Sequence, residues 1–284
     1  METSLPTVTP VAGALGADIA GVDLSQTLSN AQWDHIHGAF LKHHVLRFHG
    51  QDMDPGAHLE FARRFGAIVS YPFGAGIPGH PDVLEIKKSP GDSRTFGNVW
   101  HTDTTYTPEP PMATMLIARE TPAVGGDTVF LNTHLAFETL SPGLQATLAG
   151  LRAVNSANKR YGADTLAAKR SAGTGVQLKE AAPEAVLEAV HPVVRRHPET
   201  GRPGLYVNPA HTTRFDGWTE AESTPLLEYL FRHQQRPEFQ CRLNWRRGTL
   251  VVWDNRSVQH YAIDDYAGHS RVMHRVTIAG DRPY

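Results

Sequence analysis

The chain has 284 residues, of which 40% are hydrophobic and 20% are charged, and its 27 lysines and arginines nearly balance its 29 aspartates and glutamates. This size allows one large buried core, while the balanced charge argues against a nucleic-acid-binding or anionic-membrane-binding surface. No apolar run approaches the ~18 residues of a membrane-spanning helix, and residues 1–6 lack a signal peptide's basic and apolar regions, so we expect a soluble cytoplasmic protein.

The N-terminal part of the chain predicts a helix, a strand and a second helix, without a catalytic set of residues. Residues 7–24 combine short β-like pieces with glycines that permit tight turns. A capping pair opens a helix over residues 29–44, and an apolar run predicts a strand over 45–48. Asp54 and Pro55 are typical of a helix start, here of a helix through residue 66.

The next segment is irregular and leads into the residues of most chemical interest. Residues 71–98 are rich in proline and glycine and contain one predicted strand, over 83–86. A long irregular segment inside a compact domain is usually functional or disordered. It ends at residues 98–106, which read Asn-Val-Trp-His-Thr-Asp-Thr-Thr-Tyr.

The middle of the chain predicts two strands, two helices and an insert. The strands cover residues 113–118 and 125–131, and a helix, loop and helix follow over 133–151. Residues 155–187 are rich in Ala, Lys, Glu and Gly and poor in large apolar groups. We interpret this stretch as an inserted, mobile, partly helical segment that could cover a site.

The remainder of the chain predicts further short strands around one amphipathic helix at residues 226–231. The single Cys241 cannot form an internal disulfide, which agrees with a reducing compartment. In total, about seven or eight strands favour a mainly β fold with helical decoration around a jelly-roll core, known as a double-stranded β-helix. We expect one domain over residues 1–284. The strands in this part are expected at 193–194, 204–207, 239–245, 248–253 and 271–278.

The end of the chain reads as strand, turn, strand, a hairpin in which two arginines share one face of the last predicted strand. Side chains two residues apart in a strand point the same way, so Arg271, Met273 and Arg275 lie on one face. The two arginine stems start ~13 Å apart, which is too far to bind one small carboxylate together and favours two separate anions. The alternative is that both arginines lie on a solvated face, and periodicity does not decide between these readings.

A His-x-Asp pair offers a metal site. In an extended segment His101 and Asp103 share a face, so an imidazole and a carboxylate can reach one ion. With His260 they complete a set of two histidines and one carboxylate, which leaves three positions open and is typical of non-haem Fe(II) oxygenases.

This pair has rivals, because the chain contains sixteen histidines. One rival lies on a predicted helix, where residues i and i+2 diverge. The other two lie in proline-containing turns, which are more often solvated bends. The pair alone is therefore weak support for a metal site. The three rivals are His58/Glu60, His80/Asp82 and His197/Glu199.

The order of these residues closely resembles the Fe(II)/2-oxoglutarate-dependent dioxygenases of the taurine dioxygenase and 2,4-dichlorophenoxyacetate dioxygenase family. The resemblance covers nearly the whole chain and depends on many short segments that occur in the same order. These segments are Gly16-Ala17-Asp18-Ile19, Gly21-Val22-Asp23-Leu24, Trp100-His101-Thr102-Asp103, Gly125-Gly126-Asp127-Thr128, His191-Pro192-Val193-Val194, His197-Pro198-Glu199-Thr200-Gly201, Val207-Asn208, Trp253-Asp254-Asn255-Arg256 and Arg271-Val272-Met273-His274-Arg275.

The resemblance implies an enzyme with Fe(II) as cofactor, 2-oxoglutarate as co-substrate, and O₂ and a small anion as further substrates. His101, Asp103 and His260 match the iron ligands, and no catalytic residue is implied beyond the metal centre. Arg271 and Thr128 match the residues that bind the distal carboxylate of 2-oxoglutarate, which is decarboxylated to succinate and CO₂. The resemblance also implies a homo-oligomer, a dimer or tetramer.

The resemblance limits the substrate only to a class. Arg275 matches the arginine that pairs with a sulfonate, sulfate ester or aryloxyalkanoate, although a strand arginine paired with a carboxylate is the alternative. A second sulfonate-binding histidine is replaced by Tyr71, or by Ser70 if the alignment slips by one residue. A pocket phenylalanine aligns near Ala157, which suggests a wider pocket and a bulkier substrate than taurine.

Four more residues are candidates for the substrate pocket. An asparagine that contacts the taurine amine aligns with Gly97, but Asn98 is adjacent to it. Tyr106, Tyr206 and His211 lie at positions that could line the pocket, and ordinary packing explains them equally well.

Two other functions use the same residues. A zinc-dependent hydrolase could employ the His/Asp/His set, but that function leaves Arg271 unexplained. A non-catalytic binding relative is disfavoured because every expected ligand is present.

Overall fold

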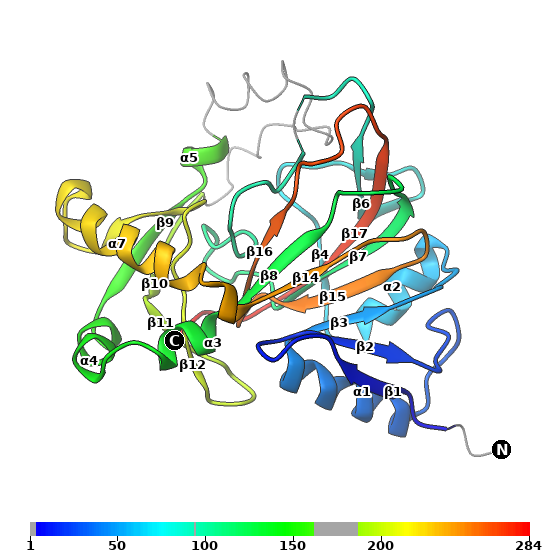
Figure 1. The fold of residues 1–284 in the computed structure, drawn as a ribbon, viewed down its shortest axis with the longest axis horizontal. Coiled ribbons are helices and arrows are strands. Elements are labelled where there is room, and N and C mark those ends of the chain that lie inside the picture. Colours follow the sequence, from blue (N-terminus) through cyan, green and yellow to red (C-terminus); the bar gives the residue numbers. More distant parts are fainter. Residues whose placement is uncertain (1–3, 94, 162–186) are drawn as a thin grey trace.

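The structure is a computed structural model that describes residues 4–93, 95–161 and 187–284. Two sheets face each other in its centre (Figure 1). The larger has the strand order β1-β2-β3-β15-β7-β17-β6-β5, with β4 paired to β17, and the smaller has the order β14-β8-β16. The strands of the larger sheet are β1 (Thr7–Pro10), β2 (Ala17–Ala20), β3 (Val45–Phe48), β4 (Ile68–Val69), β5 (Gly76–Ile77), β6 (His80–Lys88), β7 (Ala113–Glu120), β15 (Leu250–Asp254) and β17 (Arg271–Ile278), and those of the smaller are β8 (Thr128–Asn132), β14 (Gln240–Leu243) and β16 (Val258–Ala262).

The two sheets enclose an apolar layer, which confirms the jelly-roll prediction. Leu116 of β7 and Met273 of β17 pack in one buried cluster with Phe130 of β8, Val258 of β16 and Leu243 of β14. Side chains alternate between the two faces of a strand. Residues of the larger sheet that do not face the smaller sheet therefore face the helices.

Two N-terminal helices cover this second face of the larger sheet. Helix α1 (Asn30–His43) begins with a capping box between Ser29 and Gln32, and α2 (Pro55–Arg63) begins with the Asp54 cap that the sequence predicts. Their apolar residues pack against the alternate residues of β7, β15 and β17. Helix α2 ends three residues earlier than predicted, because residues 64 and 65 continue as a hydrogen-bonded turn.

A further group of elements packs beside the two sheets (Figure 1). Its helices and strands surround a separate apolar cluster. The predicted insert at about 155–187 lies mostly outside the described residues, and its first residues belong to β9 and α5. The elements of this group are α3 (Thr133–Glu138), α4 (Pro142–Ala149), β9 (Arg152–Ser156), α5 (Asn158–Tyr161), β10 (Glu188–Pro192), β11 (Val194–Arg196), β12 (Pro203–Leu205), β13 (Thr212–Phe215), α7 (Glu220–Gln234) and the 3₁₀ helix η1 (Pro237–Phe239).

Two expectations about the strands were wrong. The described residues form seventeen strands rather than seven or eight, because several are only two to five residues long and lie between glycine and proline turns. The final strands are also not neighbours. Strand β16 belongs to the smaller sheet, whereas β17 pairs with β6 and β7 in the larger one. Residues 263–270 cross between the sheets, so His260 and Arg271 face each other across the interior.

The turn between β15 and β16 is held by a buried ion network. Arg256 donates from Nε and Nη2 to the carboxylate of Asp254, and His197 Nε2 lies 2.9 Å from Asp254 Oδ2. Burial raises the pKa of Asp254, but the attached Arg256 and His197 outweigh this effect and hold the pKa well below its usual value. The network fixes the start of the strand that carries His260.

In the part of the chain that the structure describes, no helix combines the length and apolar character needed to cross a membrane.

Candidate metal centre

A backbone bridge brings the two predicted histidine ligands together. His101 N donates to His260 O at 3.1 Å, and His260 N donates to His101 O at 2.8 Å. This pairing places both side chains on one face, with their ring centroids 4.1 Å apart. Residues from distant parts of the chain thus lie side by side at the middle of β16.

Asp103 completes the cluster that the sequence predicts. Its Oδ1 lies 3.7 Å from His101 Nε2 and 3.9 Å from His260 Nε2, and one donor atom from each residue lies within 4.8 Å of the others. An ion with ligand bonds of about 2.1 Å can join donor atoms up to about 4.2 Å apart. Both histidine–carboxylate pairs are therefore close enough to share one ion.

The protonation states of these groups suit a metal. Burial lowers the pKa of His101 to about 4 and that of His260 well below its usual value, so both imidazoles are neutral. Burial also raises the pKa of Asp103, but Arg275 and the two histidines outweigh this effect and the net pKa is lowered. His101 Nδ1 donates to Val99 O at 2.6 Å, which leaves Nε2 available as the ligand atom.

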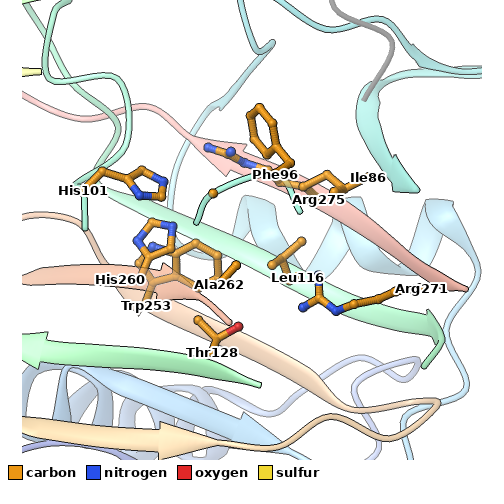
Figure 2. A pocket seen from close by; sticks show the side chains of 11 residues that line it. Ile86, Phe96, His101, Leu116, Thr128, Trp253, His260, Ala262, Arg271 and Arg275 are labelled. Carbon is orange, nitrogen blue, oxygen red and sulfur yellow. The ribbon is translucent and has the colours of Figure 1, made fainter. Parts of the chain in front are cut away.

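A pocket extends from the two histidines to Arg271 (Figure 2). His101 and His260 lie at one end, the guanidinium of Arg271 lies at the other, and Leu116 lies between them. The side of the pocket nearer β6 and β17 carries apolar residues together with Arg275. The complete lining is Ile86, Phe96, Gly97, His101, Leu116, Thr128, Trp253, His260, Ala262, Arg271 and Arg275.

Arg271 is a buried cation without a carboxylate partner among the described residues. Only 5% of the residue is exposed, its Nε has no hydrogen-bond partner, and its guanidinium carbon lies 5.6 Å from the centroid of the Trp245 ring. Thr128 also lines the pocket and accepts a hydrogen bond from Trp245 Nε1 at 3.0 Å, so its hydroxyl proton can point to a ligand. A buried cation of this kind is costly unless an anion joins it.

Arg275 lines the pocket and also pairs with the carboxylate of Asp103 in the metal cluster. Its Nη2 lies 3.1 Å from Asp103 Oδ2, its Nε donates to Thr277 Oγ1 at 3.3 Å, and its guanidinium carbon lies 5.1 Å from the centroid of the Tyr71 ring. The sequence allows two interpretations of Arg275, an anion-binding residue and a strand arginine paired with a carboxylate, and the structure has features of both. It is a strand arginine with a carboxylate partner, and it faces the pocket.

Tyr71 packs against Arg275 and is not part of the pocket lining. Its hydroxyl donates to the hydroxyl of Tyr161 at 2.9 Å. The alternative residue, Ser70, donates to Asp82 at an exposed position and is not part of this pocket lining. Ala157 is buried in the same aromatic cluster as Tyr71 and Tyr161 and is not among the residues that line this pocket.

The other four predicted lining residues also lie outside the pocket lining. The ring centroid of His211 lies 6.3 Å from that of His101, and Tyr106 packs edge-on against His211. Tyr206 packs against Arg195 and His191 in the neighbouring group of elements. Asn98 is half-buried, and Gly97 beside it contributes to the lining instead.

Sequence reasoning missed several residues that form the pocket. Leu116 lies on a predicted strand and lines the pocket. The alternation of side chains along the strand shows which residues point the same way, but not which sheet they face. Trp253 belongs to a segment that carries the family resemblance, yet no role was predicted for it. Phe96 and Ala262 come from irregular or terminal positions that give no periodic signal.

Comparisons with known proteins give matches over nearly the whole chain. The family model for taurine catabolism dioxygenase TauD, TfdA family, matches residues 7–277. An alpha-ketoglutarate-dependent sulfate ester dioxygenase of Pseudomonas putida is 35% identical over 97% of this chain and 90% of its own length. An alkylsulfatase of Acinetobacter baylyi is 35% identical over 95% of this chain and 83% of its own length. The crystal structure of a taurine dioxygenase from Burkholderia xenovorans, 34% identical, superimposes with a TM-score of 0.82 over 99% of this chain and 91% of that chain.

Proposed function

The chain belongs to the taurine catabolism dioxygenase TauD, TfdA family, and from this premise we propose that it uses Fe(II) to hydroxylate a small sulfate ester. It is an enzyme, a 2-oxoglutarate-dependent dioxygenase that acts on a small organic anion. The observation that carries the proposal is a buried cluster of two histidines and one carboxylate at one end of a pocket, with a buried cation at the other, Arg271, which has no carboxylate partner among the described residues.

The proposed iron would be held by His101, Asp103 and His260. Bound iron and 2-oxoglutarate supply the oxidising chemistry, in which the keto acid is decarboxylated to succinate and CO₂ as the substrate is hydroxylated. Arg271, at the end of the pocket opposite the histidines, would bind the far carboxylate of 2-oxoglutarate, and Thr128, which also lines the pocket, would share this carboxylate. A planar guanidinium suits this carboxylate because it can donate two parallel hydrogen bonds.

The substrate class follows from the other side of the pocket. Arg275 offers a positive charge next to the apolar side chains of Ile86 and Phe96. An anionic group with an alkyl chain matches that combination. Hydroxylation of the carbon bonded to the ester oxygen gives an unstable product that releases sulfate. Sulfonates and aryloxyalkanoates offer the same pairing of charge and apolar surface and are the alternatives within the class.

The test is substrate-stimulated O₂ uptake by the Fe(II)-loaded enzyme with 2-oxoglutarate. A panel of medium-chain alkyl sulfates, alkanesulfonates and aryloxyalkanoates is compared at equal concentration. We expect alkyl sulfates to give the largest stimulation, with one succinate formed for each sulfate released. Turnover with none of the three classes would contradict the substrate proposal.

Arg275→Gln tests the role proposed for this arginine. We expect the KM for the organic anion to rise by about 30-fold or more, because loss of one partner of a buried charged pair costs about 2–5 kcal/mol. The KM for 2-oxoglutarate should change little. Arg202→Gln, which removes an exposed arginine paired with Glu138, is the control. A loss of metal affinity with an unchanged KM for the anion would assign Arg275 to Asp103 alone.

The zinc-hydrolase alternative is not favoured, because hydrolysis gives no reason for the buried Arg271 opposite the metal cluster. We further propose a cytoplasmic location, which is supported by a single, buried Cys241. A dimer or tetramer is proposed on the family resemblance, and sedimentation analysis would test it.

A further inference from the structure

We propose that Thr114 and Asn255 are positioning residues that hold Asp103 as a ligand through one oxygen only. The inference rests on the proposed metal centre and extends it to a set of buried side chains that do not touch the ion. Thr114 lies on β7 and Asn255 lies in the turn after β15. Both are completely buried, and neither lines the pocket.

Three hydrogen bonds connect the pocket wall to the carboxylate. Trp253 Nε1 donates to Asn255 Oδ1 at 3.0 Å, Asn255 Nδ2 donates to Thr114 Oγ1 at 3.0 Å, and Thr114 Oγ1 donates to Asp103 Oδ2 at 2.7 Å. We call this chain of bonds the Trp253–Asp103 relay. None of its members is more than 3% exposed. Its hydrogen bonds are therefore shielded from water.

The direction of the relay is fixed by chemistry. An indole N–H can only donate, so the amide oxygen of Asn255 faces Trp253 and the amide nitrogen faces Thr114. Thr114 then accepts from this nitrogen, and its one hydroxyl proton is left for the carboxylate. The Thr114 hydroxyl therefore donates a hydrogen bond to Asp103. It could present only its oxygen to Asp103 if the amide of Asn255 were turned around.

The two carboxylate oxygens of Asp103 consequently have different contacts. Oδ2 receives Thr114 and lies 3.1 Å from Arg275 Nη2, whereas Oδ1 faces the two histidines. For Oδ2 to bind the ion as well, these two donors would have to give way. Holding the carboxylate to one metal bond keeps coordination positions free for the keto acid and O₂, which the proposed reaction needs.

The same relay reaches a second ligand. The ring of Trp253 packs against that of His260 with centroids 4.7 Å apart. Metal-bound histidines usually donate their second ring nitrogen to an acceptor. His101 does so, but Nδ1 of His260 has no hydrogen-bond partner among the described residues. Packing against Trp253 therefore orients His260, and the hydrogen bond from Trp253 couples this orientation to Asp103.

The experiment measures the Kd for Mn(II) of the metal-free protein. We expect Thr114→Val to weaken binding by about 10- to 100-fold, because residues that orient metal ligands typically contribute that much. Thr114→Ser keeps the hydroxyl and should restore binding to within about threefold of the unmodified protein. Thr133→Val is the matched control, since Thr133 is also buried and its hydroxyl has no partner among the described residues.

A second variant tests the direction of the relay. In Asn255→Asp the new side chain, when ionised, can only accept a hydrogen bond, so the proton of Thr114 is drawn toward it and away from Asp103. We expect Mn(II) affinity to fall although Thr114 is intact. Thermal unfolding of each metal-free variant shows that it is folded, and if Asn255→Asp fails to fold, the Thr114 series decides.

The outcomes separate the relay from the metal centre. If the unmodified protein binds Mn(II) and Thr114→Val binds it equally well, the relay has no positioning role and the metal centre stands. If the unmodified protein binds no Mn(II), both the metal centre and the relay are overturned. Equal losses in Thr114→Ser and Thr114→Val would also contradict the proposal, because the hydroxyl would then not be the group that matters.

Discussion

A His101→Ala variant is expected to lose metal-dependent turnover of 2-oxoglutarate and to bind Fe(II) or Mn(II) more than ~100-fold more weakly, beyond the loss typical of groups that only orient a ligand. His101 supplies one of three donor atoms that lie within 4.8 Å of one another. Removing it leaves one imidazole and one carboxylate, too few to hold the ion firmly. Metal affinity is measured by titration without oxygen, and turnover is measured as succinate formed.

The control for this variant is His80→Ala. His80 and Asp82 form a His-x-Asp pair with the same spacing in sequence, but the structure places them at the start of β6, and they are not part of the metal cluster. We expect this variant to keep its metal affinity and its turnover. Equal losses in the two variants would show that general destabilisation, not loss of a ligand, explains the effect of His101→Ala.

These two pairs illustrate what sequence spacing can predict. The spacing His-x-Asp predicts that the two side chains share a face if the chain is extended. This spacing occurs both at residues 80–82 and at residues 101–103. The structure places His80 and Asp82 in a strand rather than in the predicted turn, so only the order of residues across nearly the whole chain distinguishes His101 and Asp103 from this rival pair. The backbone bridge that joins His101 to His260 depends on two sheets meeting, and no local pattern contains that information.

The arginine strand shows the same limit. Alternation predicts correctly that Arg271, Met273 and Arg275 share a face, and burial of all three confirms that this face is internal. It does not reveal the sheet to which the strand belongs, and the expected pairing of the last two strands was wrong. The correct placement on opposite sheets puts Arg271 across the pocket from the histidines.

Substrate-side residues were the least predictable part of the site. The position of Tyr71 in the sequence suggests a role toward the anion, but its hydroxyl bonds to Tyr161 and its ring packs on Arg275. Side-chain direction there depends on neighbours from distant segments. Tertiary packing determines these neighbours. Matching Tyr71 to one position of the family pattern therefore does not predict where its side chain points.

Arg271→Met is expected to raise the KM for 2-oxoglutarate by about 30-fold to several thousand-fold, because loss of a buried charged hydrogen-bond partner costs about 2–5 kcal/mol. The Kd for Mn(II) should stay unchanged, since Arg271 lies at the end of the pocket opposite the metal cluster. Arg271→Lys keeps the charge without the planar fork, so we expect an intermediate KM.

The free energy of unfolding provides a second test of Arg271, because replacing this residue should weaken ligand binding without weakening the fold. Burial lowers the pKa of Arg271, which means that its charged form is held in the protein at a cost. A buried cation without a carboxylate partner destabilises the ligand-free fold, so Arg271→Met should leave the free energy of unfolding unchanged or increase it. Urea unfolding without 2-oxoglutarate measures this quantity. A marked loss of stability together with an unchanged KM for 2-oxoglutarate would identify Arg271 as a structural residue. Weaker binding of 2-oxoglutarate by an equally or more stable protein would show that the function of the Arg271 charge is to bind this ligand.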